Sequence, residues 1–184
     1  MNKLIILDRD GVINQDSLEY IKSPDEFIFL PGSIKAIKRL CDAGYTLAIA
    51  TNQSGIARGY YTEAMLHTIH EKLLMQVNAA GAKIACIQYC PHMPDARCAC
   101  RKPMPGMLYA IAKQLGCALD GAVMVGDRIT DILVARAAGV RPMVIVSSMT
   151  DHARLNEFPE VPVFVSLETC VDVILSPVWQ PEKS

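Results

Sequence analysis

The sequence predicts an α/β protein built on a doubly wound, mostly parallel sheet. Short apolar runs of strand length alternate along the chain with segments whose apolar residues recur at helical spacing. The apolar runs are continuous, as is typical of parallel strands that helices cover on both faces. Polar residues directly follow several of these runs, and open α/β sheets bind ligands at this carboxyl edge.

The length and composition indicate one domain. The chain has 184 residues, of which 51% are hydrophobic and 20% charged, a balance typical of a globular protein with one sizeable core. We expect a single domain over residues 1–175 and a loose tail over 176–184. The formal net charge of -1 argues against general nucleic-acid binding, which normally requires a basic excess.

The sequence shows no signal for export or membrane insertion. Its first apolar run ends at Asp8, which is too early for a signal peptide. No run approaches the roughly 18 to 20 apolar residues of a membrane span. We therefore expect a cytoplasmic monomer with neither a membrane nor a nucleic acid as partner.

The first half of the chain starts with a buried strand over 4–7. Residues 15–29 show no sustained period, so we expect a loop there, with a short hairpin at most, that could cover Asp8. Pro-Gly-Ser introduces an amphipathic helix over 33–43, and the glycine after it ends the helix. A second buried strand follows over 45–50.

The longest predicted helix spans 62–80. Six of its apolar residues recur at helical spacing, and Gly81 ends it. His67 and His70 lie within it and have the spacing of a metal-binding pair. No acid or cysteine nearby supports such a site, so we expect both histidines to face solvent.

The second half continues the alternation of strand and helix. We expect strands and helices in the order strand 83–89, helix 107–115, strand 122–125, helix 129–138, strand 142–146, strand 161–165 and helix 167–175. Four cysteines lie in or beside these and earlier apolar elements and are predicted to be core residues: Cys41, Cys86, Cys117 and Cys170.

Four strand ends, or the loops after them, deliver polar residues to one edge of the predicted sheet. Asp8 and Asp10 follow the first strand, and close carboxylates favour a hard cation such as Mg2+ between or beside them. Together with a hydroxyl, amides and a lysine, carboxylates meet the needs of phosphoryl transfer. The full set is Asp8, Asp10, Thr51, Asn52, Arg101, Lys102, Asp127 and Asp131.

These residues, in this order, resemble the four motifs of the haloacid dehalogenase-like phosphatases, and the resemblance covers most of the chain. It implies that Asp8 attacks phosphorus to give an aspartyl-phosphate and that Asp10 is the general acid and base. It also implies that Mg2+ is held by the Asp8 carboxylate, the Asp10 main-chain carbonyl and Asp127, with Asp131 in support. Thr51 and Lys102 would hold the phosphoryl oxygens.

A second constellation lies in the loop 90–105. Cys90, His92, Cys98 and Cys100 provide three thiols and one imidazole within a loop poor in apolar residues. This set suits tetrahedral zinc, and because it leaves no open position the zinc would be structural. We therefore predict a zinc-binding loop over 90–103.

Within the family, the chain resembles the D-glycero-D-manno-heptose-1,7-bisphosphate 7-phosphatases. The zinc loop before Arg101, the segment 51–59 and the expected absence of a bulky cap domain carry this resemblance. It implies a phosphorylated sugar as substrate, in the synthesis of nucleotide-activated heptose for lipopolysaccharide. The predicted substrate-binding residues are Thr51, Asn52, Gln53, Arg58, Arg101, Lys102 and Arg128.

Two alternatives stay open at this point. The zinc loop and the segment 126–132 resemble histidinol-phosphate phosphatases at least as well. A protein of another class would keep the fold and the zinc loop for binding but lack phosphatase activity; the presence of all four aspartates disfavours this alternative.

Overall fold

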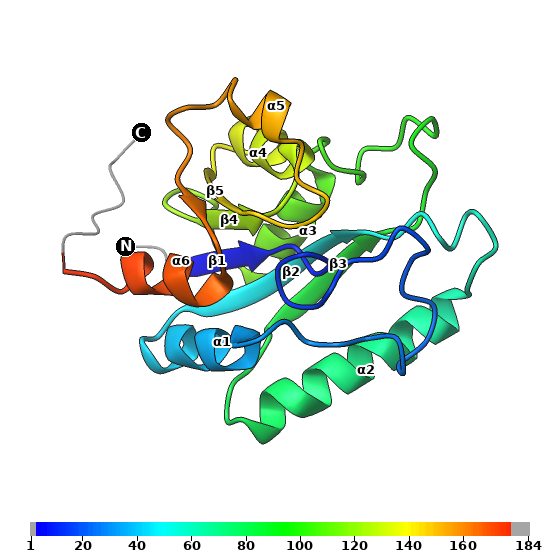
Figure 1. Cartoon of the computed structure of the whole chain (residues 1–184), viewed down its shortest axis with the longest axis horizontal. Coiled ribbons are helices and arrows are strands. Elements are labelled where there is room, and N and C mark those ends of the chain that lie inside the picture. The colour runs from blue at the N-terminus through cyan, green and yellow to red at the C-terminus, as the bar shows by residue number, and fades with distance from the viewer. Residues whose placement is uncertain (1–2, 178–184) are drawn as a thin grey trace.

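The computed structural model describes residues 3–177, and its centre is a six-stranded parallel sheet (Figure 1). The strands are β1 (Leu4–Leu7), β2 (Thr46–Asn52), β3 (Cys86–Cys90), β4 (Val123–Gly126), β5 (Arg141–Ile145) and β6 (Val163–Phe164). Their order is β3-β2-β1-β4-β5-β6, and each described neighbouring pair is parallel. The chain thus winds outward in both directions from β1, and the carboxyl ends of β1 and β4 meet at the switch point where such sheets bind ligands.

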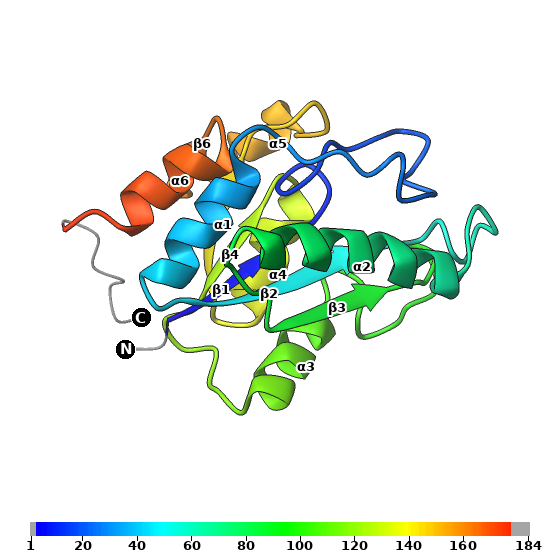
Figure 2. The same ribbon diagram turned by 90° about the horizontal axis from the view of Figure 1, so that it is seen from below.

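Helices cover both faces of the sheet. One layer holds α1 (Ser33–Asp42), α2 (Glu63–Ala79) and α6 (Leu167–Ile174), and the other holds α3 (Gly106–Leu115) and α4 (Ile129–Ala137) (Figures 1 and 2). β1 shows why its apolar run is continuous: Ile5 and Leu7 pack into one core cluster, while Leu4 and Ile6 pack into the other. The predicted fold class, with no large cap domain among the described residues, is confirmed.

Several local expectations differ from the structure. Residues 15–29 form the expected loop, but without a regular hairpin; Asn14, just before it, makes isolated bridges to Phe29, antiparallel, and to Asp10, parallel. β6 is shorter than expected, and an unpredicted short helix, α5 (His152–Leu155), follows β5. Short elements of this kind have too few residues to show a periodicity in the sequence.

The two histidines of α2 have different environments, so one of the two predictions was wrong. His67 is exposed as expected, but His70 is 6% exposed and lies against the interior. Among the cysteines predicted to be core residues, Cys86 and Cys170 are buried, whereas Cys41 and Cys117 are only half-buried.

No helix within residues 3–177 is both long enough and apolar enough to cross a membrane. The residues of the predicted tail from 178 onward lie outside the described part of the chain.

Candidate active site and metal centres

A cleft of about 750 Å³ opens at the carboxyl edge of the sheet. Its walls come from the loops that follow β1, β2, β3, β4 and β5. Asp127 and Asp131, predicted to hold or support the metal, lie outside the cleft lining. The lining does include the other residues predicted for chemistry or substrate binding: Asp8, Asp10, Thr51, Asn52, Gln53, Arg58, Arg101, Lys102 and Arg128.

Asp8, in the lining of this cleft, lies beside two further carboxylates that are fully buried, those of Asp127 and Asp131. Each of Asp8, Asp127 and Asp131 has a carboxylate oxygen that lies within 4.8 Å of those of the other two. The pairing of β1 with β4 places them, because the Asp8 amide donates to the Val125 carbonyl at 2.8 Å. Gly11 permits this approach: its φ is +81°, and a Cβ there would lie 2.3 Å from a carboxylate oxygen of Asp127.

Lys102 is buried between two of these carboxylates. Its ammonium lies 2.9 Å from Asp8 and 2.7 Å from Asp131, and it donates to the Ala50 carbonyl at 2.9 Å. Asn52 fixes the main chain of Lys102: its amide donates to the Lys102 carbonyl at 3.2 Å and its oxygen accepts from the Lys102 amide at 3.1 Å. Asn52 therefore contacts the lysine loop directly, in addition to lining the cleft.

The acidic cluster is short of positive charge. Burial, reinforced by Asp131 and Asp10 and only partly offset by Lys102, raises the pKa of Asp8 to about 7. Burial and the neighbouring Asp8 and Asp131 raise the pKa of Asp127 to about 8. One oxygen of Asp127 is buried without a hydrogen-bond partner, although Ser147 donates to the other at 2.5 Å. An orphaned, buried carboxylate oxygen beside a second carboxylate fits a divalent cation with oxygen ligands.

Asp10 has a different environment from Asp8. Arg9 donates to both of its oxygens, at 2.9 and 3.0 Å, and Asn14 and Gln53 each donate to it at 2.8 Å. Burial alone would raise the pKa of Asp10, but the Arg9 charge and these hydrogen bonds outweigh it and hold the pKa below its ordinary value. The two aspartates of the motif therefore differ in ionisation because they differ in partners.

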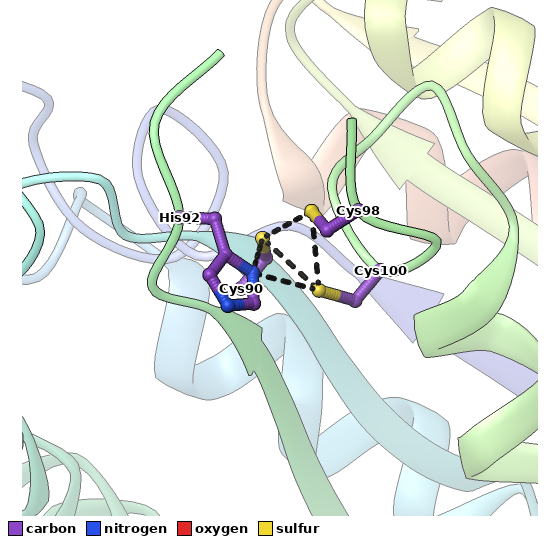
Figure 3. Close-up of side chains that lie close together, drawn as sticks. All are labelled: Cys90, His92, Cys98 and Cys100. Atoms are coloured by element: carbon purple, nitrogen blue, oxygen red, sulfur yellow. Dashed lines mark hydrogen bonds between the residues drawn. The ribbon is translucent and has the colours of Figure 1, made fainter. Parts of the chain in front are cut away.

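The second predicted cluster is assembled beside the cleft, where Cys90, His92, Cys98 and Cys100 point toward one another (Figure 3). The three sulfurs lie 3.2, 3.5 and 3.6 Å apart, and His92 Nδ1 lies 3.3 Å from Cys100 and 3.5 Å from Cys90. Sulfurs bound about 2.3 Å from a tetrahedral zinc are roughly 3.7 Å apart. The four side chains thus form a compact set of soft ligands that could hold one metal ion.

Sequence reasoning missed several residues of the site. Arg97 and Arg154 also line the cleft and add two guanidinium groups to those predicted. Arg9 is completely buried behind Asp10, although its place within Asp-x-Asp was visible in the sequence. Asp16 pairs with Arg128 at 2.6 Å across the mouth of the cleft. No sequence signal marks these three residues, because Arg97 and Asp16 lie in loops without a pattern and Arg154 lies in α5, which is too short to show one.

Comparison with known proteins agrees with this geometry. Residues 99–170 match a family model described as HAD-hydrolase-like. The D-glycero-β-D-manno-heptose-1,7-bisphosphate 7-phosphatase of Pseudomonas aeruginosa is 54% identical over 142 residues, which cover 77% of this chain and 80% of the relative. The enzyme of the same name from Pseudomonas putida is 48% identical over 158 residues, which cover 86% of this chain and 90% of the relative.

A solved structure shows the same likeness in three dimensions. The D,D-heptose 1,7-bisphosphate phosphatase of Bordetella bronchiseptica, crystallised with magnesium and phosphate, superposes with a TM-score of 0.86 at 43% identity, covering 94% of this chain and 98% of the other. The resemblance inferred from the motifs is thus confirmed, and the chain belongs to the family of D-glycero-β-D-manno-heptose-1,7-bisphosphate 7-phosphatases, within the haloacid dehalogenase-like hydrolases.

Proposed function

We propose that this protein hydrolyses the 7-phosphate of D-glycero-D-manno-heptose 1,7-bisphosphate, in the supply of nucleotide-activated heptose for lipopolysaccharide. The observation that carries the proposal is the buried cluster of Asp8, Asp127, Asp131 and Lys102, which reaches a cleft lined by arginines through Asp8 and Lys102. Such a cluster suits a reacting phosphoryl group, and such a lining suits a second phosphate. A binding protein without activity would have no need for this cluster.

Mg2+ fits the acidic cluster, with the Asp8 and Asp127 carboxylates and the Asp10 main-chain carbonyl as its ligands. When bound, the ion neutralises charge on the phosphoryl oxygens and favours ionised Asp8. Asp131 supports the site by a different route: it accepts from the Asp127 and Arg128 amides, at 3.2 and 3.0 Å, and holds Lys102.

Asp8 is the nucleophile in this proposal. Its carboxylate attacks phosphorus and forms an aspartyl-phosphate, which divides one difficult displacement into two. Lys102 and Thr51 hold the phosphoryl oxygens. Thr51 Oγ1 accepts from Gln53 at 2.8 Å, so its own hydrogen is left to donate to the phosphate.

Asp10 serves both half-reactions. It gives a proton to the leaving alkoxide as the phosphorus–oxygen bond breaks, and it takes a proton from the water that hydrolyses the phosphoryl-enzyme. The depressed pKa of Asp10 suits the second step. For the first step the carboxyl must carry a proton, and the negative charge of an arriving phosphate raises its pKa toward that form.

The distal phosphate requires cations beyond the reacting centre. We assign this role to the arginines of the cleft lining, with Arg58, Arg101 and Arg128 as the primary set and Gln53 as a further amide in the pocket. We further propose a monomer as the active unit and a cytoplasmic site of action.

The thiol and imidazole cluster is proposed to bind one structural zinc. It supports the site because Cys100 is followed at once by Arg101 and Lys102, so that fixing the cysteine also fixes the lysine. Arg101 donates to the His92 carbonyl at 3.1 Å and binds the two ends of the loop to each other.

Trapping the phosphoryl-enzyme tests the proposal. Asp8→Asn is nearly isosteric and should abolish turnover while the protein stays folded. In a slow Asp10→Asn variant, mass spectrometry should find phosphate on Asp8, and finding it on another residue would contradict the assignment. Turnover measured with heptose bisphosphate, histidinol phosphate and small sugar phosphates tests the substrate. If histidinol phosphate is turned over faster than heptose bisphosphate, the proposed substrate is wrong and histidinol phosphate takes its place.

A further inference from the structure

The buried guanidinium of Arg9 is the least expected charge in the molecule. Its side chain is fully buried, and Asp10 is the carboxylate with which it pairs. A buried arginine is tolerated only where its N–H groups find acceptors, because an unsatisfied donor costs about 1–3 kcal/mol. The neighbours of Arg9 therefore determine where its guanidinium can lie.

One of these neighbours is His70, which reaches Arg9 from α2. Arg9 Nη1 lies 3.3 Å from His70 Nε2. Arginine has only donors, so the imidazole nitrogen must accept, which requires a neutral ring with its proton on Nδ1. Burial and the Arg9 charge lower the pKa of His70 to about 3, in agreement with a neutral ring.

Two other contacts complete the cradle around Arg9. The Phe27 ring lies 5.7 Å from the guanidinium carbon, and Gln53 Oε1 accepts from Arg9 at 3.3 Å. Tyr61 donates to the same Gln53 oxygen at 2.6 Å, which fixes the amide so that its nitrogen faces Asp10. These contacts hold the Arg9 guanidinium in one position, in which it donates to both carboxylate oxygens of Asp10.

We propose that His70 is a positioning residue for the phosphatase reaction, acting through Arg9 to hold the Asp10 carboxyl where it exchanges protons with the leaving group and with water. This inference rests on the proposed role of Asp10. His70 is not part of the cleft lining; it supplies the acceptor without which Arg9 would leave a buried donor unpaired and shift.

Phosphoryl-enzyme formation with two leaving groups tests this role. The alkoxide of heptose 1,7-bisphosphate needs a proton from Asp10, whereas the p-nitrophenolate of p-nitrophenyl phosphate leaves without one. Misplacing Asp10 should therefore slow the alkyl substrate selectively. For His70→Leu we expect a loss of roughly tenfold to a hundredfold in the single-turnover rate constant with the heptose, and of less than about threefold with the aryl phosphate.

Two further variants separate positioning from packing. His70→Gln keeps an acceptor near Nε2 and should restore most of the heptose rate. His67→Leu is the matched control: His67 lies on the same helix, is exposed, and the one hydrogen bond of its ring among residues 3–177 is to Tyr89 at 3.3 Å, so both rates should match those of the wild type. Equal losses with both substrates for His70→Leu, or no rescue by His70→Gln, would overturn the proposal.

A measurement on the wild-type protein covers the case in which His70→Leu does not fold. The ¹⁵N spectrum of the His70 imidazole should show the neutral Nδ1-protonated form throughout the neutral pH range. An imidazolium or an Nε2-protonated ring would remove the acceptor and with it the proposal. Wild-type protein that cleaves the aryl phosphate but not the heptose would contradict only the proposed substrate, and histidinol phosphate, also a primary alkyl phosphate, then becomes the alkyl probe.

Discussion

The ammonium of Lys102 lies 2.7 Å from a carboxylate oxygen of Asp131, and only 2% of either side chain is exposed. This contact joins the loop after β3 to the start of α4. Asp131 also accepts from the Asp127 and Arg128 amides, so one carboxylate orders both the lysine and the turn that carries a predicted metal ligand.

Asp131→Asn should test this ordering, because it keeps the shape of the side chain but removes its charge. Lys102 would then be held by Asp8 as its remaining carboxylate partner. We expect kcat to fall about tenfold to a hundredfold, measured by phosphate release at saturating Mg2+. Asp42→Asn, which alters an exposed pair with Lys38, is the control. Unchanged activity in Asp131→Asn would show that the pair does not position Lys102.

The acidic cluster predicts that the metal-free protein loses stability as pH rises. Asp8 and Asp127 have an ordinary pKa of 3.8, which is raised in the folded state to about 7 and about 8. Between about pH 4 and pH 8 these two carboxyls therefore bind more protons in the folded state than in the unfolded one, so the free energy of unfolding falls as pH increases. The lowered pKa of His70 opposes this below its ordinary value of 6.5, but by one proton against two. Below about pH 4 the contribution of the two carboxyls is fully present.

Urea unfolding across this pH range, with and without Mg2+, measures the effect. Mg2+ should flatten or reverse the loss at the alkaline end, because it binds the ionised carboxylates. Asp127→Asn should weaken the pH dependence in the metal-free protein. A free energy of unfolding that is independent of pH in metal-free protein would contradict the ionisation assigned to the cluster.

The arginines of the cleft lining predict discrimination between bisphosphate and monophosphate. If Arg58, Arg101 or Arg128 contacts the distal phosphate, its alanine variant should lose far more kcat/KM on heptose bisphosphate than on the matching 7-monophosphate. A charge-assisted contact contributes roughly 1.5 to 3 kcal/mol, or about tenfold to a hundredfold. Arg97→Ala and Arg154→Ala extend the series to the two arginines that the structure added. Equal losses of kcat/KM on both substrates in all five variants would show that none of these arginines binds the distal phosphate.

The cysteine cluster predicts about one zinc per chain. Cys98→Ser should lose the metal and most of the activity, because the loop then has little to offset its conformational entropy and no longer holds Lys102 in place. The sheet should stay folded by circular dichroism. Mg2+ should not rescue the variant, since it prefers oxygen ligands. Cys117→Ser, outside the cluster, is the matched control, and protein purified without chelator that contains no zinc would refute the site.

The strands, most helices and the polar residues that follow the strands could be read from sequence because each depends on neighbours along the chain. The run Leu4 to Leu7 indicated a strand covered on both faces, and the two core clusters into which it packs confirm this. The shorter elements escaped prediction because they do not depend mainly on neighbours along the chain. β6 and α5 are too short to carry a period, and contacts from distant segments determine their conformation.

By itself, the sequence determined the parallel α/β fold, the family and the list of groups at the carboxyl edge. Only the tertiary structure decided how those groups are paired. His67 and His70 are equivalent in the sequence, yet His70 is buried because α2 packs toward Arg9. Asp8 and Asp10 are two residues apart, yet one lies among carboxylates and the other against a guanidinium. These differences arise from groups brought together across the fold, where burial and charge act over distance in space and not along the chain.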